Sequence, residues 1–349
     1  MHGYGTSDGG PKRKEVTNEN DDNDRLCCHR TAAGISDRLP ERVIEHSWGV
    51  RVNVVPSWEQ VWERPYGQNW KEHWLPGFGI PYDQLRPGIP SGICVRMYGD
   101  DMCDERHIPS GGGVVELTEG SHSLLFYNDD TEYIIFNNIA SVSAASATTR
   151  TRTRASYAET HAGEAMVSAP DMLYGHFIEH YEGERVFGWK DLPVTLRPLV
   201  YTYLIRYEFQ SGFEYVSLAR GALAGMAGSV YLKDGRTGDD AVTVLYDCEL
   251  HDGYIQAVVK TFGVPDFWDK YYSSSRGMRT YGLNLEVRMK NGKLKDFDFD
   301  ISSQLRNQPR GGVITVNGIQ ISNEEGTEGS SGFNPDVEGW GESEDIFLN

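Results

Sequence analysis

Hydrophobic and polar residues alternate along much of the chain, and this period of two is typical of β-strands that are buried on one face. Residues 48–54 carry one tryptophan and three valines at every second position. Residues 201–209 carry tyrosines, an isoleucine and a phenylalanine in the same way. Because alternation rather than a helical period organises these segments, the sequence predicts an all-β fold.

Short turns between the alternating segments predict antiparallel hairpins. Residues 114–117 and 122–127 form one expected hairpin, and a strand at 132–136 follows it. Residues 283–289 and 294–301 flank Asn291-Gly292, a pair that favours the type I′ turn of a two-residue hairpin. Asn317-Gly318 predicts a second hairpin of this kind, between strands at 313–316 and 319–321.

Glycine and proline interrupt the pattern near the middle of the chain. Gly188, Pro193 and Pro198 restrict the backbone there, so a domain boundary is expected near Leu192. Two β-sandwiches in tandem are the simplest architecture for these strands. The expected organisation is a disordered leader at 1–41, a first β-sandwich with a Trp-rich insertion at 42–192, a second β-sandwich at 193–328, and a linker with a C-terminal strand at 329–349.

The C-terminal segment predicts assembly. A flexible spacer at residues 329–332 precedes apolar residues that are set among acids. A strand detached in this way must find a sheet edge, in its own chain or in another, to satisfy its backbone N–H and C=O groups. The residues expected to add to such an edge are Phe333, Val337, Trp340, Ile346 and Leu348.

Composition and charge exclude several classes of protein. The 349 residues suffice for two domains with their own cores, and hydrophobic residues make up 39% of them, which is typical of a folded protein. The formal net charge of −18 repels nucleic acids, so no nucleic-acid partner is expected. No apolar run approaches the roughly twenty residues that a membrane-spanning helix requires.

Sequence patterns for catalysis and metal binding are missing. The five cysteines lack the paired spacing of zinc ligands. Asp296, Asp298 and Asp300 recur at every second residue, as expected of a solvated strand face rather than a calcium loop. Neither a Gly-x-Ser-x-Gly motif nor a phosphate-binding glycine loop is present. We therefore expect neither an enzyme nor a cofactor nor a metal. Cys94 and Cys103 flank a turn and form either a disulfide or, more simply, two free thiols.

Four tryptophans occur in two pairs spaced four residues apart, within a loop-like segment that is rich in proline and glycine. If these side chains were exposed, they would offer aromatic faces on which sugar rings stack. Large aromatic side chains are more often buried beneath such a loop, so core packing is the favoured interpretation. The residues concerned are Trp58, Trp62, Trp70 and Trp74.

Three short motifs carry a resemblance to a known family. They are the tail pattern Gly-Phe-x-x-x-Val-x-x-Trp-Gly at 332–341, the Gly- and Ala-rich segment 218–228, and Thr-Phe-Gly-Val-Pro-Asp at 261–266. With the cysteines that precede the first strand, they resemble a Bacteroidetes family of fimbrillin-related surface proteins whose biochemical role is undefined. The resemblance runs from about Trp48 to the end of the chain. It implies transthyretin-like sandwiches and, as in related fimbrillins, assembly by strand donation between subunits.

The same resemblance implies export to the cell surface as an outer-membrane lipoprotein. Cys27 or Cys28 would then be the acylated N-terminal residue, and this anchor would be the protein's only contact with the membrane. The residues before them form a polar leader without the apolar segment of an export signal, and ordinary thiols are the alternative.

Taken together, these features predict a non-enzymatic surface protein that serves as an accessory or anchoring subunit of a fimbria-like assembly. Its expected partners are other fimbrial subunits or surface proteins, bound by β-strand addition. The alternative is a surface lipoprotein that binds glycan through the tryptophan platform.

Overall fold

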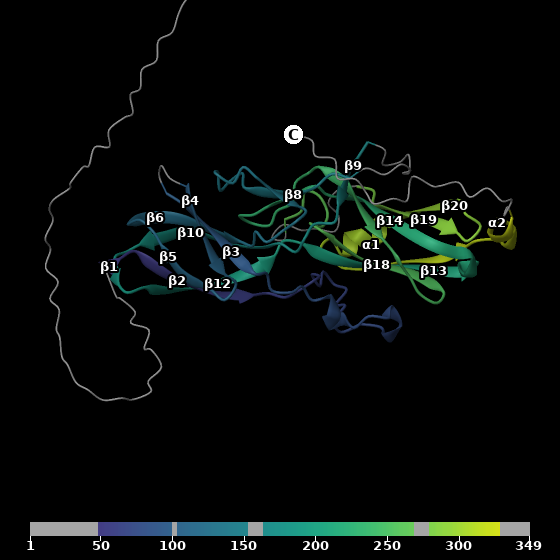
Figure 1. The fold of residues 1–349 in the computed structure, drawn as a ribbon, viewed down its shortest axis with the longest axis horizontal. Coiled ribbons are helices and arrows are strands. Elements are labelled where there is room, and N and C mark those ends of the chain that lie inside the picture. The colour runs from purple at the N-terminus through teal and green to yellow at the C-terminus, as the bar shows by residue number, and fades with distance from the viewer. Residues whose placement is uncertain (1–47, 100–102, 153–162, 269–278, 329–349) are drawn as a thin grey trace, which may run out of the picture. The chain divides into compact units, whose positions relative to one another are not determined.

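The computed structural model describes residues 48–99, 103–152, 163–268 and 279–328. Strands account for most of the regular structure, which confirms the predicted all-β fold (Figure 1). Within this part of the chain, no helix is both long and apolar enough to cross a membrane. The helices of the described residues are short: η1 Pro76–Phe78, η2 Tyr82–Leu85, η4 Phe213–Tyr215, α1 Ser302–Asn307 and α2 Asn323–Thr327.

The first large sheet has seven strands in the order β4-β3-β6-β10-β12-β2-β5. One face covers a buried core that includes Val54, Val95 and Phe126. In Figure 1, the labels of these strands gather apart from those of β13, β14, β18, β19 and β20. The strands are β2 Arg51–Trp58, β3 Gly92–Tyr98, β4 Cys103–Pro109, β5 Gly113–Glu116, β6 Gly120–Tyr127, β10 Tyr174–Gly183 and β12 Lys190–Pro198.

Two further sheets share one hydrophobic core and form a sandwich. Their orders are β17-β18-β13-β21 and β20-β19-β14-β16-β9. The hydroxyls of Tyr207 and Tyr246 meet at 2.7 Å between the two layers. The strands are β9 Ala165–Ser168, β13 Tyr201–Ser211, β14 Val216–Ala227, β16 Ala241–Asp247, β17 Glu249–Leu250, β18 Tyr254–Thr261, β19 Gly282–Met289, β20 Leu294–Asp300 and β21 Gly312–Gln320.

Small sheets complete the fold and mix the two halves of the chain. The three-stranded sheet β15-β8-β7 joins a strand of the second half to two strands of the first, and β9 pairs in parallel with β16. Leu192, near which the sequence predicts a domain boundary, lies within β12. The two-domain organisation and its boundaries therefore remain predictions from the sequence. The remaining strands are β1 Trp48–Gly49, β7 Ile134–Asn137, β8 Ser146–Thr149, β11 Val186–Phe187 and β15 Ser229–Tyr231.

Most predicted strands are present, but two of the three predicted hairpins need correction. The antiparallel β19–β20 hairpin is confirmed. Its last paired residues before the loop are Arg288 and Leu294, and of Asn291 and Gly292 only Gly292 has positive φ. The loop is therefore not a two-residue type I′ turn. The predicted hairpin at 313–321 is wrong. Residues 312–320 form the single strand β21, parallel to β13, because the backbone at Asn317-Gly318 makes a bulge instead of reversing.

The predicted hairpin at 114–127 is also wrong. Both segments are strands, but β5 pairs with β2, and β6 pairs with β3 and β10. The β3–β4 hairpin does contain both cysteines that the sequence places beside its turn. In its register Cys94 faces His107 and Cys103 faces Tyr98, so the two thiols are not opposite each other, and both are free.

Candidate functional site

The ends of the seven-stranded sheet form an opening. Strands β4 and β5 are the first and last in the strand order, yet only residues 110–112 separate them in sequence. A connection of this length spans about 14 Å at most, so the sheet must curl until its two ends are neighbours. No pairing links β4 to β5 among the described strands. The two strands therefore splay from a shared turn.

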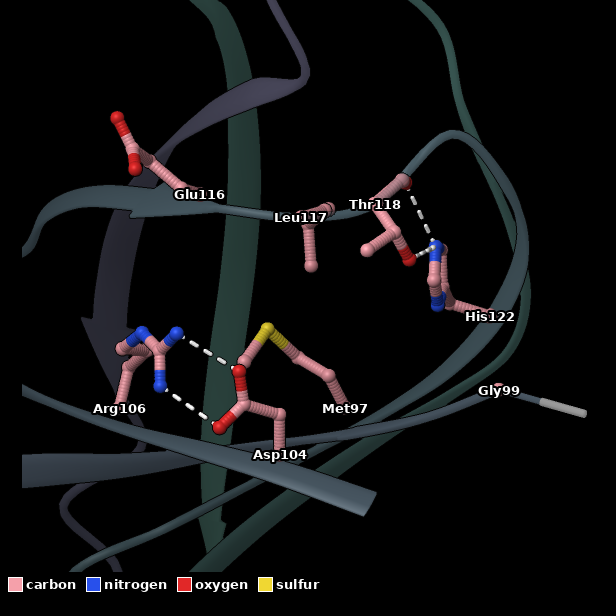
Figure 2. Close-up of a pocket in the computed structure, with 8 residues that line it drawn as sticks. All are labelled: Met97, Gly99, Asp104, Arg106, Glu116, Leu117, Thr118 and His122. Atoms are coloured by element: carbon pink, nitrogen blue, oxygen red, sulfur yellow. Dashed lines mark hydrogen bonds and ion pairs between the residues drawn. The ribbon is translucent and has the colours of Figure 1, made fainter. Parts of the chain in front are cut away.

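A pocket of about 190 Å³ lies between the splayed strands. Figure 2 shows Met97 lying in the space between Leu117 and the Asp104–Arg106 pair. Met97 is 5% exposed and belongs to the core of the sheet, and Leu117 packs partly buried against the same core. The floor of the pocket is thus apolar. We call this opening, with its lining residues Met97, Gly99, Asp104, Arg106, Glu116, Leu117, Thr118 and His122, the β4–β5 groove.

Charged side chains form the rim of the groove. Arg106 Nη2 lies 2.7 Å from Asp104 Oδ2, and Arg51 Nε lies 3.0 Å from Glu116 Oε1. The pKa of Asp104 is lowered because its carboxylate accepts hydrogen bonds from the Glu105 backbone N–H and from Arg106. The rim charges are therefore largely paired, and the groove offers apolar contact rather than a strong local field.

The groove also presents unpaired strand edges. Because β4 and β5 end the strand order, each has one edge without a strand partner among the described residues. The edge of β4 is partly occupied, because the Glu105 backbone N–H donates to Asp104 Oδ1 and the Glu105 C=O accepts from Arg106 Nη1. The edge of β21 is occupied by side-chain amides. Gln304 pairs with the N–H and C=O of Thr315, and Gln308 pairs in the same way with Val313. Natural sheets block edges in such ways to prevent association, so of the two strands of the groove β5 is the candidate for binding.

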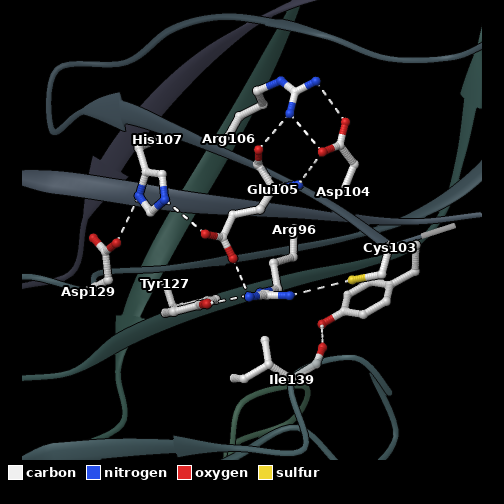
Figure 3. Close-up of polar contacts among 10 residues, drawn as sticks. Arg96, Cys103, Asp104, Glu105, Arg106, His107, Tyr127, Asp129 and Ile139 are labelled. Carbon is white, nitrogen blue, oxygen red and sulfur yellow. Dashed lines mark hydrogen bonds and ion pairs between the residues drawn. The ribbon is translucent and has the colours of Figure 1, made fainter. Parts of the chain in front are cut away.

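A polar network lies on the opposite face of β4. Because side chains alternate along a strand, Cys103, Glu105 and His107 point away from the groove. Figure 3 shows His107 between Asp129 and Glu105, with Glu105 in turn paired to Arg96. Arg96 also donates from Nε to the Tyr127 hydroxyl at 3.1 Å. These contacts join β3, β4 and the end of β6.

The structure separates the four tryptophans of the predicted glycan platform. Trp62 is 1% exposed and packs in a small core with Phe78 and Leu85. Trp70 and Trp74 are partly buried on that core, and their indole N–H groups donate to Gln308 Oε1 and to the Ile80 carbonyl. Trp58 belongs to a different core and meets Tyr174 edge-on at 5.0 Å. The four rings do not share one exposed face.

Other predicted site residues lie outside the described part of the chain. These are the lipidation candidates Cys27 and Cys28, and the tail residues Phe333, Val337, Trp340, Ile346 and Leu348. Sequence reasoning also missed the β4–β5 groove, because the groove depends on β5 pairing with β2 instead of with the adjacent β6. The glycines between β4 and β5 were its only local signal, since they permit a tight turn.

Comparison with known proteins supports the sequence resemblance. Residues 84–247 match the family model described as a domain of unknown function (DUF5119). A curated protein of Bacteroides ovatus, provisionally named fimbrium anchoring subunit Fim4B, is 24% identical over 186 residues, which cover 52% of this chain and 55% of that protein. The chain thus spans about half the length of this relative.

Solved structures show the shared fold. The crystal structure of a protein provisionally called an adhesin, from Bacteroides ovatus ATCC 8483, aligns over 78% of this chain and 94% of its own with 18% identity and a TM-score of 0.53. The fimbrial anchor protein Mfa2 from Porphyromonas gingivalis aligns over 76% and 90% with 13% identity, but its TM-score of 0.36 supports no argument. Residues 84–247 thus resemble the DUF5119 domain, and the resemblance of the chain to fimbrillin-related surface proteins of Bacteroidetes is confirmed.

Proposed function

We propose that this chain is a non-enzymatic cell-surface protein, an accessory or anchoring subunit of a fimbria-like assembly, which binds a partner subunit by β-strand addition in the β4–β5 groove. The observation that carries the proposal is the splayed pair of strands above an apolar floor, in which the edge of β5 has no strand partner among the described residues. The names of the curated relative and of the similar structure support a role in adhesion or fimbrial anchoring.

The size of the groove favours a peptide over a small molecule. Pockets for small-molecule ligands usually measure about 300–1,000 Å³, and this one measures about 190 Å³. That volume suits one or two side chains. An added strand would take its main-chain hydrogen bonds from β5 and would place alternate side chains on Met97 and Leu117. Main-chain bonding supplies affinity in this mode of recognition, and the floor supplies specificity.

The C-terminal segment is the proposed donor strand. Residues 333–349 would leave one copy or subunit and enter an edge of the next, with Phe333, Val337, Trp340, Ile346 and Leu348 at the contact. Export as an outer-membrane lipoprotein, acylated at Cys27 or Cys28, would place the assembly on the cell surface. The glycan alternative gains no support from the tryptophans, which lie in two different cores.

The proposal is tested by measuring whether a synthetic peptide of residues 333–349 binds to a protein that ends at residue 328. Fluorescence anisotropy should show saturable binding, and hydrogen exchange should show new protection in β5. Leu117→Lys should weaken binding at least tenfold because a charge enters the apolar floor. Leu218→Lys is the matched control, since Leu218 is 47% exposed on β14, and it should leave binding unchanged.

Two results would overturn the proposal in its stated form. Binding with protection confined to other edges would show that strand addition occurs elsewhere. If the peptide does not bind, and if the Leu117→Lys variant captures its partner on the native cell surface as well as the wild type does, the groove is not the acceptor.

A further inference from the structure

The cluster behind the groove combines three types of metal-binding side chain. One donor atom each from Cys94, His107 and Asp129 lies within 4.8 Å of the other two. Cys94 on β3 faces His107 on β4 across the ladder and faces Tyr127 on β6 on its other side. Asp129 follows two residues after Tyr127. Adjacent strands therefore hold a thiol, an imidazole and a carboxylate together from well-separated positions in sequence.

The imidazole of His107 lies between two carboxylates. Its Nε2 is 2.9 Å from Glu105 Oε1, and its Nδ1 is 2.8 Å from Asp129 Oδ2. A neutral imidazole carries one N–H, so it can donate to only one of these oxygens. A protonated ring donates to both oxygens, whereas a neutral ring that donates from Nε2 to Glu105 leaves the lone pair of Nδ1 facing the Asp129 carboxylate. A cation that takes the place of the Nδ1 proton would be bound by Nδ1 and by Asp129 together.

The cluster does not have the geometry of a cysteine nucleophile with its base. In that arrangement one imidazole nitrogen faces the thiol and the other faces a carboxylate. Here the carboxylates of Glu105 and Asp129 occupy both nitrogens. Burial also raises the pKa of Cys94 to about 11, whereas a catalytic thiol needs a lowered value.

We propose that Cys94 Sγ, His107 Nδ1 and Asp129 bind a divalent cation of the zinc class. Sulfur, imidazole nitrogen and carboxylate oxygen are the three donor types that zinc takes in proteins, and softer or harder ions match this mixed set less well. Three protein ligands leave a fourth position for water or for a group from a partner. Binding releases the thiol proton of Cys94, and also the Nδ1 proton of His107 wherever the ring is protonated, so affinity rises with pH.

The distances suit this ion after small side-chain movements. Zinc bonds of about 2.0–2.3 Å put tetrahedral ligands roughly 3.5 Å apart. The contact between His107 and Asp129 would open by less than an ångström from 2.8 Å, and the thiol would approach within the present limit of 4.8 Å. The side chains of His107 and Asp129 are 58% and 33% exposed, so both can move and the ion can enter from solvent.

Surrounding groups support the ligands. Glu105 accepts from His107 Nε2 and pairs with Arg96, which orients the ring with Nδ1 toward the ion. In the free protein, burial and the negative charges of Glu105 and Asp129 raise the pKa of the Cys94 thiol, while the Tyr127 hydroxyl hydrogen bond and Arg96 act in the opposite direction and favour the thiolate. Arg96 is thus linked to two of the three ligands through Glu105 and Tyr127.

Cobalt(II) is the first probe, because a cobalt–thiolate bond absorbs in the near ultraviolet and reports sulfur ligation directly. The full chain should carry Cys27→Ser and Cys28→Ser, so that the leader thiols contribute no signal. We expect one equivalent of Co²⁺ to produce the charge-transfer band and one equivalent of Zn²⁺ to remove it. Cys94→Ser should abolish the band.

Further variants separate ligands from neighbours. His107→Asn should abolish binding, and it changes an exposed side chain, so it remains informative if Cys94→Ser does not fold. Glu105→Gln should weaken binding about 10–100-fold as a group that orients a ligand. Cys103→Ser is the matched control because Cys103 lies on the same face of β4 and contacts Arg96 instead of the cluster. The proposal is overturned if the wild type gives no band at millimolar Co²⁺, or if Cys94→Ser retains it.

Discussion

Truncation of Trp62 distinguishes core packing from the glycan platform. Its side chain is 1% exposed, and its ring centroid lies 5.7 Å from that of Trp74 and 5.1 Å from that of Tyr82. The cluster around it packs against Leu204 on β13 and Val313 on β21. Trp62→Ala removes a large buried side chain whose place the packed neighbours cannot fill, so we expect the free energy of unfolding to fall by about 3–5 kcal/mol.

Two comparisons calibrate that value. Trp74 is only partly buried, so Trp74→Ala should cost less, about 1–3 kcal/mol. Trp62→Phe retains an aromatic ring and removes an indole N–H that has no hydrogen-bond partner among the described residues, so its cost should be about 1–2 kcal/mol. Trp62→Ala is thus expected to destabilise the fold most, and the other two variants less.

Urea unfolding, followed by far-ultraviolet circular dichroism, measures these differences. With a slope of about 3 kcal/mol per molar urea, the loss expected for Trp62→Ala moves the midpoint down by about 1 M or more. The glycan platform predicts the opposite outcome, in which the midpoint is kept and binding on a glycan array is lost. A change in stability below about 1 kcal/mol for Trp62→Ala would refute the packing argument.

Three other changes test further parts of the fold. A Cβ at position 221 would overlap the ring of Tyr246, so Gly221→Ala should cost about 1–3 kcal/mol in urea unfolding, and an unchanged midpoint would contradict that packing. Gln304→Ala uncovers part of the edge of β21, so gel filtration should show more concentration-dependent association than for the wild type, and an equal profile would contradict the blocking role. The pKa of Glu325 is lowered to about 2, chiefly by its hydrogen bond with Lys295, from an ordinary value of 4.5. Its ionised form therefore stabilises the fold above pH 4.5, and this contribution is lost as the pH falls toward 2. Glu325→Gln should flatten the urea midpoint across that interval, and an unchanged pH profile would contradict the assignment.

The sequence predicts strands well because the signal for them is local. At residues 48–54 and 201–209, alternation reports which side chains face a core, and the structure places strands at both. Near Tyr201, however, the polar partners are buried as well: Thr202 and Arg206 are each 5% exposed. Alternation indicated a solvated second face for this strand, and burial by neighbouring segments decided otherwise.

The sequence-based prediction failed mainly in choosing which strands pair with each other. Adjacent segments with a short turn look like a hairpin, yet β5 leaves β6 and pairs with β2. For the same reason a hairpin was predicted at Asn317-Gly318, where β21 instead forms a bulge and continues along β13. Backbone hydrogen-bonding groups are the same in every strand, so local sequence does not select among edges. The total packing of distant side chains makes that choice.

What the sequence determined by itself was therefore the all-β class, most strand positions, the β19–β20 hairpin and the resemblance to fimbrillin-related proteins. The tertiary structure alone decided which strand ends the curled sheet, and so placed the apolar groove between β4 and β5. It also brought Cys94, His107 and Asp129 together, although their spacing matches no metal motif. Local periodicity depends on residues that are near in the chain, whereas these sites depend on the register and order of strands, which long-range packing sets.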